Sequence, residues 1–252
     1  MRPYAVNIAM REIGEAVALA LIGRCGQLAG LCLLLAMSVT ARAFSDGPLG
    51  AQAANDDFGV MCGPRPSVDG GPNDYRQRVV DRELSRLAEL QVQFHLNPAL
   101  DALRTGYHVN VIGNLNYTLM RWPNFQPALQ LLIQYDAIGG KSFGNPKAEC
   151  YLAWARRFVP DDAVVWSFSG LYYFKKKNLE IATTMWERAL SIDPTLAEAH
   201  YNLGLVYFET KNYEKSLEHA KLAYGGGYPL LGLRRKLDAV GRWTRPQVSK
   251  EP

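Results

Sequence analysis

Residues 163–223 contain one pattern twice, at an offset of 34 positions. Shifting the first copy onto the second aligns three identical pairs: Gly170 with Gly204, Tyr173 with Tyr207, and Ala189 with Ala223. Repeats of this length are supersecondary units that bury their apolar faces only against neighbouring units. The pattern therefore predicts a stacked array of similar units in this part of the chain.

The shared residues have a packing reason. Two antiparallel helices pack closely where small residues lie at their crossing, and Gly170 and Ala189 meet this need in the first copy. Pro194 cannot continue a helix and ends that copy. Thr195 and Glu198 have the spacing of a capping box, which predicts that a helix begins there.

The first copy resembles a tetratricopeptide repeat, a helix–turn–helix unit of 34 residues. The residues at its signature positions are Trp166, Gly170, Tyr173, Ala182, Trp186, Ala189 and Pro194, and those of the second copy include Gly204, Tyr207 and Ala223. The resemblance implies an all-α solenoid, wound as a right-handed superhelix. Clear repeats are expected at 163–196 and 197–230.

A degenerate repeat is expected at 124–162. Ala148, Ala155 and Pro160 lie 34 residues before their counterparts in the first clear copy. The first helix of this unit fits the pattern only if its inter-helix turn, around 139–146, holds about three extra residues.

The remaining helices follow from apolar periodicity and from breakers. We expect helices over 76–96, 99–104 and 112–122, with Asn97-Pro98 ending the first and opening the second. Pro229 is expected to open a capping helix within 229–241, which a solenoid needs at its end. The helical domain is therefore predicted at 76–241, with a tail at 242–252.

The N-terminal region predicts export. An apolar run from Cys25 to Val39 follows Arg24 and is followed by Ala41-Arg42-Ala43, which has the form of a signal-peptidase site. We expect a signal peptide over 1–43 and a periplasmic or secreted mature protein. An uncleaved anchor and a start at Met10 are the alternatives. Residues 44–75, rich in Gly, Pro, Asp and Asn, are expected to be an irregular and partly disordered lead-in.

After removal of the signal, Cys62 and Cys150 would be the two remaining cysteines. An oxidising compartment favours a disulfide between them, which would pin the lead-in to the helices. The alternative is a buried thiol at Cys150 and an exposed or intermolecularly paired one at Cys62.

The resemblance also implies a concave groove, lined by the first helix of each pair, that holds an extended peptide or a partner's helix. The groove candidates in this chain are Gln130, Gln134, Ser167, Leu171, Phe174, Lys175, Tyr201, Leu205, Phe208 and Glu209. The alternative for the aromatic candidates is that neighbouring helices cover them as core. The Lys/Asn/Arg clamp with which chaperone-binding members hold a C-terminal carboxylate is absent at these positions.

Other function classes have little support. The net charge is +4 with mixed signs, and no basic run suggests a nucleic-acid site. The four histidines, His95, His108, His200 and His219, show no spacing typical of a metal site or of a catalytic nucleophile. We therefore predict no enzyme activity, no cofactor and no metal. We also predict no strong membrane binding after the signal peptide is cleaved.

The leading hypothesis is therefore an exported scaffold or adaptor that binds a protein or peptide in the groove. The alternative is a structural or assembly factor of a cell-envelope or secretion complex.

Overall fold

The structure, a computed structural model, describes residues 62–243. The predicted signal peptide, residues 44–61 of the lead-in and nearly all of the tail lie outside this range. Within it every regular element is helical, which confirms the all-α prediction. None of these helices combines the length and apolar character needed to cross a membrane. Their bounds are α2 Arg82–Gln91, α3 Asn97–Thr105, α4 His108–Arg121, α5 Gln126–Ala137, α6 Ala148–Phe158, α7 Ala163–Lys175, α8 Leu179–Ile192, α9 Ala197–Glu209, α10 Tyr213–Gly225 and α11 Gly232–Ala239.

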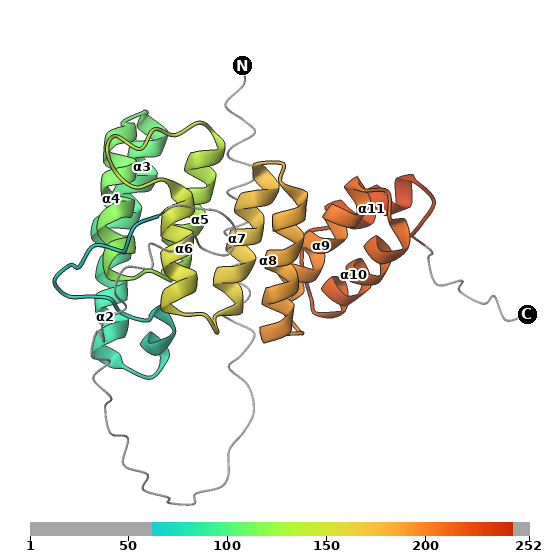
Figure 1. The fold of residues 1–252 in the computed structure, drawn as a ribbon, viewed down its shortest axis with the longest axis horizontal. Helices are drawn as coiled ribbons and strands as arrows, with labels where there is room; N and C mark the ends of the chain where they lie inside the picture. Colours follow the sequence, from blue (N-terminus) through green and yellow to red (C-terminus); the bar gives the residue numbers. More distant parts are fainter. Residues whose placement is uncertain (1–61, 244–252) are drawn as a thin grey trace, which may run out of the picture. The chain divides into compact units, whose positions relative to one another are not determined.

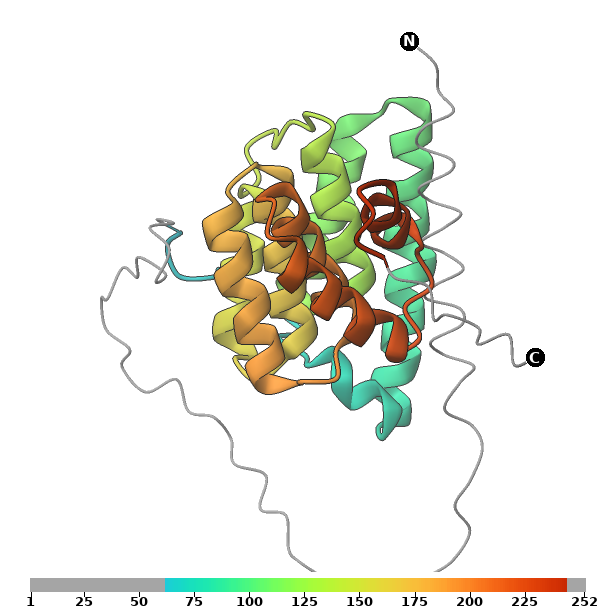
Figure 2. The ribbon, with the colours of Figure 1, turned by 90° about the vertical axis from the view of Figure 1, so that its right-hand side faces the viewer.

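Helices α5 to α10 form three successive hairpins, and each helix lies beside the next in chain order (Figures 1 and 2). The first helices of the hairpins, α5, α7 and α9, also contact one another in sequence. This is the pairwise packing of helix–turn–helix repeats, so the fold class predicted from the 34-residue offset is confirmed.

Gly170 lies against the indole ring of Trp186, as the small-against-large pattern predicts. A Cβ atom at residue 170 would lie 2.6 Å from Trp186 Cε2. The indole is fully buried and donates a hydrogen bond from Nε1 to the carbonyl oxygen of Ser167 at 3.1 Å. The crossing of α7 and α8 therefore depends on a residue without a side chain at position 170.

The start of α9 differs from the prediction. Leu196 is the N-cap and gives no side-chain hydrogen bond, so the expected capping box of Thr195 and Glu198 is wrong. The Thr195 hydroxyl instead donates to Asp193 Oδ1 at 2.7 Å, and the Thr195 amide donates to the same oxygen at 2.9 Å. This local turn places the Thr195 side chain away from the free amides of α9.

Two other helix boundaries differ as well. Asn97-Pro98 does not interrupt the chain, because a π-turn at Val92–Leu96 (η2) joins α2 to α3 and Asn97 keeps helical dihedral angles. The capping helix begins at Gly232 rather than at Pro229. The Tyr224 hydroxyl donates to the Leu230 carbonyl oxygen at 3.1 Å and accepts from the Arg234 amide at 3.0 Å, which fixes the non-helical approach to α11.

The lead-in is irregular from Cys62 to Asp74, ends in a 3-10 turn at Tyr75–Val79 (η1), and lies against α4 and α6. A disulfide joins Cys62 to Cys150 on α6, with Cα atoms 5.3 Å apart. Next to it, Trp154 Nε1 donates to the Gly63 carbonyl oxygen at 2.8 Å. At the end of α4, Arg65 donates to the Met120 carbonyl oxygen at 2.6 Å. Covalent and polar contacts thus hold this segment on the helices.

Candidate partner-binding groove

The candidate groove residues lie on α5, α7 and α9, and a polar network fixes the starts of the first two of these helices. Asn124, fully buried just before α5, donates from Nδ2 to Asp162 Oδ2 at 3.2 Å and to Asp74 Oδ1 at 2.7 Å. Asp162 is the N-cap of α7, and its Oδ1 accepts from the amides of Val164 and Val165. One buried amide therefore connects the first turns of α5 and α7.

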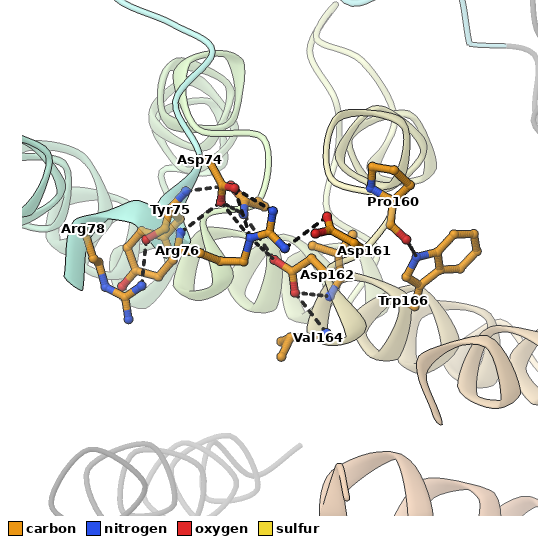
Figure 3. A network of polar contacts seen from close by, with 11 residues as sticks. Asp74, Tyr75, Arg76, Arg78, Pro160, Asp161, Asp162, Val164 and Trp166 are labelled. Carbon is orange, nitrogen blue, oxygen red and sulfur yellow. Dashed lines mark hydrogen bonds and ion pairs between the residues drawn. The ribbon is translucent and has the colours of Figure 1, made fainter. Parts of the chain in front are cut away.

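Arg76 completes this network from the lead-in (Figure 3). Its guanidinium group makes a bidentate contact with Asp74 and lies 3.1 Å from Asp161 Oδ1 and 3.9 Å from Asp162 Oδ2. Burial alone would raise the pKa of Asp74, but hydrogen bonds from Arg76 and Asn124 lower it overall. Arg76 thus lies among three carboxylates and joins the lead-in to the turn that precedes α7.

Most of the predicted groove residues retain exposed surface. On α5 the candidates Gln130 and Gln134 are half-buried. On α7, Leu171 and Phe174 are half-buried and Lys175 is exposed. The candidates thus carry amide groups on α5, and apolar groups and one ammonium group on α7.

Ser167 and Tyr201 are buried, so the prediction that they face a partner is wrong. Ser167 is fully buried on α7, which α5, α6, α8 and α9 all contact, and its hydroxyl group has no hydrogen-bond partner in the described structure. Tyr201 is 7 % exposed, because the ring of Tyr228 lies 4.4 Å from its own ring and the backbone of Gly232 covers its hydroxyl end. For Tyr201, the alternative stated for the aromatic candidates therefore holds: neighbouring elements cover it as part of the core.

Groove candidates on α9 contact the capping helix α11. Leu205 and Phe208 are half-buried and Glu209 is exposed. Lys236 of α11 lies 3.3 Å from Glu209 Oε1, and its ammonium group lies 5.1 Å from the centre of the Phe208 ring. A partner that reaches α9 would therefore also contact α11.

Ile138 is an exposed apolar residue at the end of α5 that was not among the predicted residues. It follows α5 directly and is 58 % exposed. Allowing for three extra residues in the α5–α6 turn, Ile138 corresponds to Lys175 at the end of α7. The repeat register is the sequence signal that identifies this position.

A cavity of about 500 Å³ lies beside the longer α5–α6 connection, away from the groove candidates. Asp136 and Lys176 form an ion pair at 2.7 Å on its wall, and the Tyr172 hydroxyl donates to Glu149 Oε2 at 3.4 Å. Burial, Asp136 and Glu149 together raise the pKa of the Tyr172 hydroxyl. The longer α5–α6 connection, where the repeat register requires about three extra residues, forms one wall of this cavity.

The four histidines contact amide, aromatic or histidine side chains. Among residues 62–243 no group of three or more His, Cys, Asp or Glu side chains is placed to hold a metal ion. His95 Nδ1 lies 3.1 Å from Asn114 Oδ1, with its ring stacked on Tyr117. His200 and His219 contact each other.

Comparison with known proteins identifies the repeat. The family model described as "TPR repeat" matches residues 170–211. A peroxisomal targeting signal receptor from Candida albicans is 32 % identical over 71 residues, which is 28 % of this chain and 12 % of that protein. Cilia- and flagella-associated protein 70 from Homo sapiens is 37 % identical over 73 residues, 28 % of this chain and 6 % of that protein. This chain therefore contains tetratricopeptide repeats, and the likeness covers only a small part of each relative.

Proposed function

We propose that this chain is a scaffold that binds a protein partner along the exposed sides of α5, α7 and α9. The observation that carries the proposal is the row of half-buried apolar side chains on the last two of these helices: Leu171, Phe174, Leu205 and Phe208. Repeat arrays use the surface that runs across successive units for binding. Partly exposed aromatic and aliphatic side chains are the usual anchors of such contacts.

The chemistry of the row indicates what a partner would present. In the described part of the chain, the amide groups of Gln130 and Gln134 take no part in an internal hydrogen bond, so both can donate to and accept from a partner's backbone. Leu171 and Phe174 offer apolar surface on the adjacent helix. The surface thus suits a segment that buries apolar side chains and pairs its polar groups with amides.

A variant binding assay tests this proposal. A partner is first captured by crosslinking in the native cell and is then purified. Its affinity is measured for the native chain and for Leu171→Ser and Phe174→Ser, with Leu222→Ser on α10 as a control that removes an exposed leucine elsewhere. We expect affinity to fall at least about tenfold for the first two variants and to be unchanged in the control. Equal affinities for all four folded proteins would contradict the proposal.

We also propose that the chain is exported and works outside the cytosol. The apolar run at 25–39 followed by Ala41-Arg42-Ala43 supports this, as does the disulfide, because such bonds persist mainly in oxidising compartments. Mass-spectrometric reading of the N-terminus of the native protein is the test. A mature start near Phe44 is expected, and an N-terminus before residue 30 would contradict cleavage.

A further inference from the structure

His200 on α9 and His219 on α10 meet across the second clear repeat, with their Nδ1 atoms 3.0 Å apart. His200 Nε2 lies 3.1 Å from the carbonyl oxygen of Pro194. A carbonyl oxygen only accepts, so Nε2 of His200 carries a hydrogen and Nδ1 of the neutral ring is an acceptor. The hydrogen between the two rings therefore belongs to Nδ1 of His219.

This arrangement limits how many protons the pair can hold. A first added proton can bind Nε2 of His219, which leaves the hydrogen bond between the rings intact. A second must bind Nδ1 of His200, where it would face the Nδ1 hydrogen of His219. Two donors would then oppose each other at 3.0 Å and both rings would be positively charged. The contact is compatible with one added proton and incompatible with two.

The surroundings of the pair also oppose added charge. His200 is 8 % exposed, and the ring of His219 stacks on Tyr207 of α9 with centres 5.4 Å apart. Burial, His200 and the neighbouring Lys215 of α10 lower the pKa of His219, and Glu218 of α10 opposes them only in part. Because the folded pKa lies below the usual value of 6.5, the stability that this group contributes is lost as the pH falls through that region.

We propose that the His200–His219 contact is a pH-sensitive latch that holds α9 against α10 at neutral pH and opens in mild acid. Ser216 Oγ donates to the Gly204 carbonyl oxygen at 2.8 Å in the same helix pair, and this bond has no titrating group. Acid therefore loosens the pair without removing every contact between the two helices. The capping helix α11 contacts both α9 and α10, so its packing weakens at the same time.

Hydrogen exchange of the full chain carrying Glu198→Gln, at pH 7.5 and 5.5 and corrected for the intrinsic rates, tests the latch without any partner. The substitution is needed because burial raises the pKa of the Glu198 carboxyl on α9 to about 7, and its titration would oppose the response. We expect the opening equilibrium of α9, α10 and α11 to rise about two- to tenfold at pH 5.5, the effect of losing one hydrogen bond, while α4 and α5 change little. His219→Asn should abolish the difference, because the amide can donate to neutral His200 or accept from its protonated form. His108→Asn, on α4, is the matched control and should keep it.

Equal exchange of α9 and α10 at the two pH values in the Glu198→Gln chain would overturn the latch. So would a full pH response in His219→Asn. If that variant does not fold, an NMR titration of the native imidazoles replaces it. His219 is expected to titrate with a pKa below the usual 6.5, and a pKa at or above that value would overturn the proposal.

Discussion

Asn124 and Asp162 are 38 residues apart in sequence, yet the amide of one donates to the carboxylate of the other at 3.2 Å inside the protein. Because these residues precede α5 and α7, their bond sets the distance between two helices that would contact a partner. The same amide accepts from the Tyr75 amide at 2.9 Å and thereby joins the lead-in to the repeats. The relative placement of α5 and α7, on which the proposed binding surface depends, is therefore fixed by a contact at one end of these helices.

Replacing Asn124 with alanine should destabilise the fold by about 1–3 kcal/mol, since three hydrogen-bonding groups on two other segments would lose their partner. The free energy of unfolding from urea titration measures this. Asn110→Ala, at an exposed position on α4, is the control and should change it by less than about 0.5 kcal/mol. Similar losses in both variants would show that Asn124 has no special role.

Gly170→Ala should also destabilise the fold, by about 1–3 kcal/mol, because the rigid indole of Trp186 cannot move away from a new methyl group. Gly113→Ala offers a matched comparison within α4, where a Cβ atom would meet nothing within 4 Å. That change should stabilise by about 0.5–1 kcal/mol through helix propensity. Thermal and urea unfolding of both variants test whether the sign of the effect differs as expected.

The disulfide closes a loop with a sequence separation of 88 residues. Replacing Cys62 and Cys150 together with serine should lower stability by about 4 kcal/mol if the chain-entropy model holds, because the unfolded chain gains freedom. Calorimetry of the double variant and of the reduced native chain measures the loss. An unchanged unfolding temperature in both would show that the lead-in contributes nothing to the helical body.

Glu198 should make stability depend on pH in the direction opposite to the histidine latch. Burial of its carboxyl group raises the pKa to about 7 from the usual 4.5, although part of the residue remains exposed. The folded chain then binds this proton more tightly than the unfolded chain, so stability is lost as the pH rises from about 4.5 to about 7. Glu198→Gln should therefore be more stable than the native chain at pH 8, by about 1–3 kcal/mol, and nearly equal at pH 4.5.

Urea unfolding at these two pH values checks the prediction for Glu198, since the difference between variant and native chain cancels other titrating groups. Glu187→Gln, at an exposed position on α8, should leave the pH dependence unchanged. A gain for Glu198→Gln that is the same at pH 4.5 and pH 8 would have a cause other than the titration of this carboxyl group.

The repeat was predictable because its determinants are local and periodic. Gly170 and Trp186 lie 16 residues apart within one unit, and the second copy repeats the pattern. The burial of Tyr201 was not predictable in the same way, because Tyr228 covers it from the non-helical segment after α10 and Gly232 covers it from the capping helix, beyond the unit. The bond between Asn124 and Asp162 has no sequence pattern, since it depends on how two turns meet after the helices have packed.

The helix boundaries show a similar contrast. Asp162 was not predicted as a cap, although Asp is among the preferred N-cap residues and it accepts two amides there. Asn97-Pro98 was expected to restart the chain because the residue before proline disfavours helical angles. The π-turn at Val92–Leu96 and the packing of α3 on α4 overcome that local preference.

Site-specific photocrosslinking in the native cell tests the central claim most directly. A photoreactive amino acid is placed at position 174 on α7 in one protein and at position 222 on α10 in another, with folding of both verified by circular dichroism. Binding along α5, α7 and α9 predicts a discrete partner adduct at position 174 that is absent at position 222. The same adducts at both positions, or an adduct at 222 alone, would contradict binding along α5, α7 and α9.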